Sequence, residues 1–273
     1  MSDGPMLPQP HNDNSNGGEL GARLVDDLLM GLRFYSRLPT GDRPHERPNL
    51  SRIALALPFT SCVIGLAPVA ALLALEWLGT AHLFSAAFAV AVGVVVTGAM
   101  AEDALADSAD GLFGGQNIEE RLAIMKDSRH GTYGVAAIVM LLLLRVSAIG
   151  SVGNPLAAAG VWLAAMVMSR SGALWLTRAL PAARSGGAAA TAGRVSMQAF
   201  AVGGIFAVIL SFVFAGFAVG VLGLALAYLS CAGVLFGWIA LCRRLIGGQT
   251  GDLIGALQAL LEIAALSAFM VFA

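Results

Sequence analysis

The chain has 273 residues, of which 58% are hydrophobic and only 12% are charged, and its mean hydropathy is +0.79. A water-soluble domain of this length could not bury so much apolar surface, so the composition excludes a soluble globular protein and predicts a polytopic membrane protein. The formal net charge is −1, and no basic stripe with interleaved aromatic residues occurs, so nucleic acid is not an expected partner. The three cysteines lie in apolar segments and are expected to be buried thiols rather than a disulfide framework: Cys62, Cys231 and Cys242.

The chain begins with a polar segment, residues 1–19, that is rich in Gly, Pro and Asn. It lacks the basic start and apolar core of a signal peptide, so we expect a disordered tail. Between Leu20 and Leu38 apolar residues recur at helical spacing, which predicts an amphipathic helix. Two placements stay open for this helix: along the membrane interface, or as a soluble helix that caps the protein.

Windows of about 20 apolar residues, the length that crosses a bilayer, follow along the rest of the chain. They lie at about 54–78, 82–101, 133–152, 156–177, 197–217, 219–242 and 253–273. The expected fold is therefore all-α, a polytopic transmembrane helix bundle of about seven spans (six to eight), with the amphipathic helix added at its N-terminus. Residues 20–273 are expected to form one integral-membrane domain.

The distribution of Lys and Arg between the spans predicts the orientation in the membrane, because basic residues in short loops gather on the cytoplasmic face. Outside the expected spans, basic residues occur in four segments: those before residue 54 and at about 102–132, 178–196 and 243–252. The three short loops between them hold no Lys or Arg: 79–81, 153–155 and 216–218. We therefore expect the N-terminus in the cytoplasm and, with seven spans, the C-terminus outside.

Four carboxylates interrupt the apolar sequence after the second window: Glu102, Asp103, Asp107 and Asp110. If the second span continues as a helix past Ala101, the three aspartates fall at i, i+4 and i+7 and project from one stripe. Like charges stacked in this way repel each other, and acids at the edge of a bilayer are costly. A hard cation such as Mg²⁺, which prefers carboxylate oxygens, would relieve both costs. The sequence predicts a Mg²⁺ site here; the alternative is a solvated helix end with ordinary surface acids.

A second polar patch follows before the third span. Lys126 and Arg129 are suited to phosphate oxygens, and Gly131 and Gly134 would let backbone N–H groups approach an anion at the start of that span. The pattern predicts a phosphate-binding segment. A basic loop that merely flanks the membrane is the alternative.

We expect different roles for two titratable residues in the same patch. Asp127 is the candidate for a further metal ligand, or for the base that takes a proton from an attacking hydroxyl. His130, taken alone, is more often a surface or capping histidine than a catalytic one.

Two arginines fall inside expected spans, where charged side chains are rare and usually face the interior of the bundle. Arg170 lies near the cytoplasmic end of its span and is expected to reach a phosphate. Arg145 lies deeper and is expected to hold helices together through an acidic partner, for which Glu262 is the candidate.

A third polar site is the loop Gly247-Gly248-Gln249-Thr250-Gly251-Asp252. Adjacent glycines followed by a Gln, a Thr and an Asp at a helix start supply backbone donors, a hydroxyl and an N-cap together. The loop is therefore a candidate binding segment, with a simple turn between spans as the alternative.

These three motifs resemble those of the cobalamin synthase family, the adenosylcobinamide-GDP ribazoletransferases. The resemblance is carried by Asp103-x-Leu-Ala-Asp107-x-x-Asp110-Gly111, Met125-Lys-Asp-Ser-Arg129-x-Gly131-Thr-x-Gly134 and Gly247-Gly-Gln-Thr-Gly-Asp252, with support from Phe34-Tyr-Ser-Arg37-Leu-Pro39 and Ser169-Arg170. In this order the motifs span nearly the whole chain after the tail. The chain departs from the family pattern at Ala101 and Ala104, where that pattern usually has a His and a Gly.

The resemblance implies a Mg²⁺-dependent phosphotransferase of the bacterial inner membrane, with residues 20–273 as its catalytic domain. Such an enzyme transfers the cobinamide-phosphate moiety of adenosylcobinamide-GDP to a ribose hydroxyl of α-ribazole or its 5′-phosphate and releases GMP; self-association as a homo-oligomer stays open. The expected metal ligands are Asp103, Asp107, Asp110 and Asp127, with Asp127 and Asp110 as the catalytic residues. The expected substrate-binding residues are Lys126, Ser128, Arg129, Gly131, Thr132, Arg170, Gln249, Thr250 and Asp252.

Two other functions would also place acids in a membrane protein. A CDP-alcohol phosphotransferase also places aspartates of a membrane helix on metals, but its pattern has Ala-Arg where this chain has Ala106 followed by Asp107. A cation transporter would carry acids at mid-membrane on several spans, and here only Glu262 is so placed.

Overall fold

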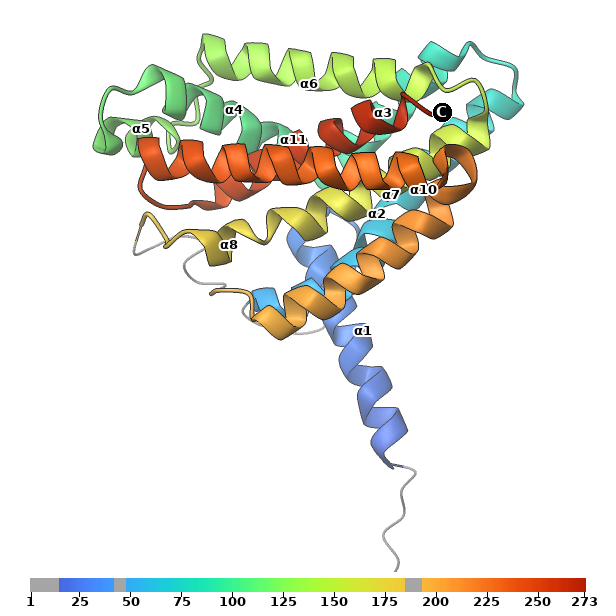
Figure 1. Cartoon of the computed structure of the whole chain (residues 1–273), viewed down its shortest axis with the longest axis horizontal. Coiled ribbons are helices and arrows are strands. Elements are labelled where there is room, and N and C mark those ends of the chain that lie inside the picture. The colour runs from blue at the N-terminus through green and yellow to red at the C-terminus, as the bar shows by residue number, and fades with distance from the viewer. Residues whose placement is uncertain (1–14, 42–47, 185–192) are drawn as a thin grey trace, which may run out of the picture.

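The computed structural model describes residues 15–41, 48–184 and 193–273, and over these ranges the chain is helical, with no strand. The helices are α1 (Ser15–Tyr35), α2 (Leu50–Trp77), α3 (His82–Thr97), α4 (Met100–Gly114), α5 (Ile118–Ile124), α6 (Thr132–Gly150), α7 (Pro155–Ala173), α8 (Leu176–Ala179), α10 (Met197–Leu245) and α11 (Gly251–Phe269). Figure 1 shows the long helices side by side in one bundle. The expected all-α membrane bundle is confirmed.

Within the described ranges, five helical segments are long and apolar enough to cross a membrane, and the pair α3 and α4 supplies a sixth if it counts as one bent span. The longest, α10, has 49 residues and would extend about 74 Å, more than twice the thickness of a bilayer core. Gly220 interrupts it with φ 64° and ψ −175°, a conformation that only glycine adopts readily. Figure 1 shows the orange ribbon turning back on itself, so α10 is a hairpin whose two limbs match the windows expected at 197–217 and 219–242.

The second expected span, 82–101, is wrong at its end, because the helix does not continue past position 97. Gly98 and Ala99 both adopt left-handed conformations, with φ of 64° and 57°, and α4 leaves at 85° to α3. A left-handed Ala costs about 1 kcal/mol, so the surrounding packing must hold the break in place. Part of that packing comes from Arg37, whose backbone N–H donates to the Val96 carbonyl at 2.8 Å and whose side chain lies against Gly98. The break starts the acid-bearing helix α4 as an element of its own.

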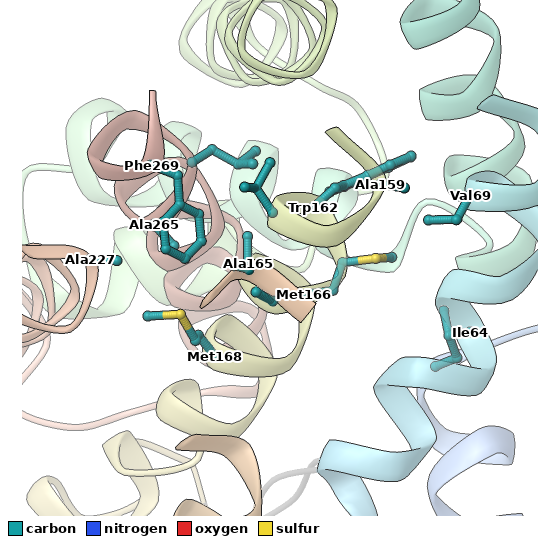
Figure 2. Packing of buried hydrophobic residues seen from close by; sticks show 14 of the residues in the cluster. Ile64, Val69, Ala159, Trp162, Ala165, Met166, Met168, Ala227, Ala265 and Phe269 are labelled. Carbon is teal, nitrogen blue, oxygen red and sulfur yellow. The ribbon is translucent and has the colours of Figure 1, made fainter. Parts of the chain in front are cut away.

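Helix α7 lies at the centre of the bundle and contacts α2, α10 and α11. Figure 2 shows its Trp162, Ala165 and Met166 packed between Ile64 of α2 and Phe269 of α11. Small residues allow this approach: a Cβ on Gly160 of α7 would collide with the Phe214 carbonyl oxygen of α10. Close contact of backbones through small side chains is the usual way in which membrane helices associate.

A buried group of charged residues joins four helices inside the bundle. Arg145 of α6 donates to Glu262 of α11 at 3.0 Å, which confirms the expected partner, and also to Glu102 of α4 at 2.6 Å. The Trp162 indole donates to the second oxygen of Glu262 at 3.0 Å. Arg170 of α7 is buried within electrostatic range of both glutamates, so two positive charges face two negative ones. Each buried charge therefore has an opposite charge near it, as burial in a membrane protein demands.

Helix α1 is amphipathic as expected and packs on α2. It begins at Ser15, inside the segment expected to be a tail, and the rest of that segment lies outside the described residues. Met30 and Tyr35 are buried, and Asp27 accepts from Arg52 of α2 at 2.6 Å. Figure 1 shows the first turns of α1 projecting away from the bundle, while its C-terminal end lies against the other helices.

Candidate active site

Helix α4 presents its acids along one stripe, because Asp103, Asp107 and Asp110 all lie within its single run of helix. Asp103 and Asp107 meet His130, which lies in the segment before α6. The His130 Nε2 is 3.8 Å from Asp103 Oδ1, and its Nδ1 is 3.8 Å from Asp107 Oδ1. One ligand atom from each of the three residues lies within 4.8 Å of the others, a spacing suited to a shared metal ion.

Asp110, the third aspartate of the stripe, faces the start of α6. Its Oδ2 accepts from the Gly131 N–H at 2.6 Å and its Oδ1 from the Gly134 N–H at 2.9 Å. A Cβ on either glycine would press into this carboxylate. The sequence predicted an anion at these two amides, and in the structure that anion is Asp110 itself, which neutralises the positive end of the α6 dipole. Asp110 as a metal ligand and Gly131 as a substrate contact stay predictions.

The loop before α11 brings a further acid to the same place. The negative charges of Asp103, Asp252 and Asp110 all act on Asp107. Arg184, from the segment after α8, acts on Asp252 with the opposite sign. Residues that are far apart in the sequence thus form one acidic cluster, whose mutual repulsion favours a bound cation.

The loop is held by its own hydrogen bonds. The backbone of Gln249 pairs with the segment that follows α8. Its N–H donates to the Pro181 carbonyl at 2.8 Å, and its carbonyl accepts from the Ala183 N–H at 2.9 Å. Thr250 caps α11, its Oγ1 accepting from the Leu253 N–H at 3.2 Å. The Gln249 side-chain oxygen is buried without a partner among the described residues. The loop is therefore a rigid support for Asp252, and the expected substrate contacts of Gln249 and Thr250 stay predictions.

Asp127 and Arg129 pair with each other at the surface. Arg129 Nε and Nη2 donate to Asp127 at 3.0 and 2.6 Å, and the Arg129 backbone N–H donates to it at 3.1 Å. The hydrogen bonds from the Arg129 side chain, and then from its backbone, lower the pKa of Asp127 from 3.8 to about 2. Asp127 is not among the three residues whose ligand atoms converge. Its predicted roles as ligand and base stay untested, and the lowered pKa makes it a weak base.

The remaining expected binding residues separate into two groups. Lys126, Ser128 and Thr132 are exposed on the same segment as His130, where a bound phosphate could reach them. Arg170 is only 2% exposed and donates to the Met166 carbonyl of its own helix at 3.3 Å. The structure therefore places the first group on the surface, in the segment around His130, and Arg170 inside the bundle.

His130 was not expected in the site, yet it lies between Asp103 and Asp107. A single histidine in a polar segment carries no signal by itself. Its role depends on the turn between α5 and α6, which returns the chain to α4 over a separation of more than 20 residues. The hydrogen bonds of Asp110 to the start of α6 fix that return and so bring His130 to Asp103 and Asp107.

Comparisons with known proteins identify the family of this chain. The family described as Cobalamin-5-phosphate synthase matches residues 27–270. A protein of Azorhizobium caulinodans named adenosylcobinamide-GDP ribazoletransferase is 40% identical over 262 residues, 92% of this chain and 98% of that protein. Proteins of the same name from a Sinorhizobium species and from Rhizobium meliloti are 42% and 39% identical, covering 89% and 90% of this chain and 95% and 96% of their own. No solved structure matches the chain. The chain belongs to the Cobalamin-5-phosphate synthase family.

Proposed function

We propose that this protein is an adenosylcobinamide-GDP ribazoletransferase. It transfers the cobinamide-phosphate moiety of adenosylcobinamide-GDP to a ribose hydroxyl of α-ribazole, or of its 5′-phosphate, and forms adenosylcobalamin, or its 5′-phosphate, and GMP. Family membership over almost the whole chain supports the reaction. The observation that carries the location of the site is the convergence of Asp103, Asp107 and His130.

The donor set fits a divalent cation of the Mg²⁺ type. Carboxylate oxygens are the ligands that Mg²⁺ prefers, and it binds through one or two of them while keeping positions open for substrate phosphates. Asp103 and Asp107 would hold the ion. Asp110 and Asp127 stay predicted as further ligands. When bound, the ion would neutralise charge on the diphosphate of the activated substrate.

The protein's own residues bind and orient the two substrates. Lys126 and Arg129 offer positive charge to the diphosphate from an exposed segment. The hydroxyl oxygen attacks the phosphorus that is bonded to cobinamide, and the bond from that phosphorus to the oxygen of GMP breaks. His130, between two carboxylates, is placed to take the hydroxyl proton, as is Asp127 if it moves away from Arg129.

We place this site on the cytoplasmic side of a bacterial inner membrane. The acidic cluster lies at one end of the bundle. That end also carries the basic segments around residues 121–129, 178–184 and 243–244. The three segments without Lys or Arg lie at the other helix ends, and the third of them, 216–218, directly precedes the turn at Gly220. The positive-inside rule then assigns the basic end to the cytoplasm.

The test is an assay of the purified full chain with adenosylcobinamide-GDP, α-ribazole and Mg²⁺, in which GMP is followed. GMP release that needs both substrates and stops with a chelator supports the proposal. CMP release from CDP-diacylglycerol and an alcohol, or ion flux in proteoliposomes without nucleotide chemistry, would refute it in favour of the two other functions.

A further inference from the structure

A small cavity of about 200 Å³ lies beside the acidic cluster, between the end of α1, the start of α2, α4 and the start of α11. Its lining includes Phe34, Tyr35, Leu174, Asp103, Asp252 and Gln258. Three of the motifs in the sequence therefore meet here, including the Phe34-Tyr35 segment, to which the proposed reaction gives no role. The cavity touches two of the four clustered acids, so its occupant would lie next to the reacting groups.

The chemistry of the lining selects a flat, mostly apolar group. Phe34 and Tyr35 form an edge-to-face pair with ring centroids 4.9 Å apart, and most other lining side chains are aliphatic. Gln258 is only 4% exposed and lines this cavity, and its amide makes no hydrogen bond within the described part of the chain. The amide is therefore available to a ligand in the cavity that presents one suitable polar atom.

We infer that this cavity binds the planar heteroaromatic base of the ribazole nucleoside, with Gln258 hydrogen-bonded to a ring nitrogen and the ribose directed toward Asp103 and Asp252. This assignment rests on the proposed function. It deepens that function by giving the nucleoside acceptor a subsite of its own. Pockets of this type, apolar with one or two placed polar groups, are typical of small-molecule recognition.

The other parts of the substrates fit this cavity less well. A guanine base would need Asp103 or Asp252 to accept from its N–H groups, and these two carboxylates belong to the acidic cluster assigned to the cation. A corrin ring is far larger than the cavity. A diphosphate would be buried among mostly apolar side chains, and no Lys or Arg of the described residues lines the cavity.

Gly251 offers a way to fill the cavity without disturbing its walls. It lines the cavity, and a Cβ added there would meet no heavy atom within 4 Å. Gly204 is a matched control, because it also has open space around its would-be Cβ but lines a different cavity, of about 560 Å³, between α7, α10 and α11. Both glycines are helical, so leucine at either position favours the helix.

The test is steady-state GMP release by Gly251→Leu, Gln258→Leu and Gly204→Leu, with each substrate varied in turn. We expect KM for α-ribazole to rise about tenfold or more in Gly251→Leu and severalfold in Gln258→Leu, while KM for adenosylcobinamide-GDP changes less than twofold. Gly204→Leu should leave both values unchanged. Detergent-solubilised Gln258→Leu that elutes as the unaltered protein does would show that its fold is kept.

The outcomes separate the inference from the proposed function. If the unaltered protein releases no GMP, the proposed function fails. If it does, and KM for α-ribazole is unchanged in both cavity variants, the inference alone is overturned. A rise confined to KM for adenosylcobinamide-GDP would overturn it as well, by assigning the cavity to the nucleotide substrate.

Discussion

Gly134→Ala tests whether the contact between Asp110 and the start of α6 builds the site. The new Cβ would collide with Asp110 Oδ2 and lie 3.0 Å from the Ala106 carbonyl oxygen, so the carboxylate must move off both amides. Asp110 is 7% exposed, and hydrogen bonds to a charged group contribute about 1.5–3 kcal/mol each. Losing two of them outweighs the gain of about 1 kcal/mol from replacing a helical glycine by alanine. We therefore expect a net destabilisation of about 2–5 kcal/mol, with His130 displaced from Asp103 and Asp107.

The assay compares thermal unfolding and GMP release of Gly134→Ala with those of Gly237→Ala in detergent. Gly237 is also helical, and a Cβ there would meet nothing within 4 Å, so this control should be neutral or slightly stabilised. Gly134→Ala should unfold at a clearly lower temperature and turn over at least tenfold more slowly. If the two variants behave alike in both measurements, the reasoning that joins Asp110 to the site is refuted.

Three further predictions concern the other charged groups. Arg145→Met should lower the free energy of unfolding by about 3–5 kcal/mol, because Glu102 and Glu262 are left buried without their partner. Adding Glu102→Gln and Glu262→Gln should restore part of that stability, measured as a rise of the unfolding midpoint. Asp127→Asn should lower KM for adenosylcobinamide-GDP and change kcat little, because it releases Arg129 from its ion pair to meet the diphosphate; a hundredfold fall in kcat at constant KM would instead make Asp127 the base. The pKa of Asp127 is lowered from 3.8 to about 2, so its ion pair with Arg129 is fully present above pH 3.8 and is lost as the pH falls through about 2. The Asp127 carboxyl signal in an NMR titration should therefore have its midpoint near 2. A midpoint near 4 would contradict the pairing.

The span pattern could be predicted from the sequence because it follows from hydropathy alone. Each expected window contains a long helix, although the second window runs past the end of α3, and the apolar lengths also predicted the two limbs of α10. The break at Gly98 and Ala99 could not be predicted. Alanine normally favours helix, and the left-handed conformation of Ala99 is imposed by packing that includes Arg37, more than 60 residues earlier.

The candidate site could be predicted in its composition more than in its contacts. Helical periodicity predicted that the three aspartates lie on one stripe of a helix. Because an unpaired charge inside the membrane is costly, the sequence also predicted that Arg145 pairs with Glu262. Which contacts each aspartate makes depends on the tertiary structure. Asp110 accepts hydrogen bonds from the α6 amides, whereas Asp103 lies near His130. These contacts are determined by backbone segments that are distant in the sequence, and a local sequence pattern carries no information about them.

The most direct test of the central claim is Mg²⁺-dependent GMP release by Asp103→Asn and Asp107→Asn. Glu119→Gln is the matched control, an acid-to-amide change on the exposed surface of α5. We predict that each aspartate variant loses at least about a hundredfold in turnover at limiting Mg²⁺ while remaining in the membrane fraction, and that Glu119→Gln keeps full turnover. Near-normal turnover in both aspartate variants would contradict a cation site on α4.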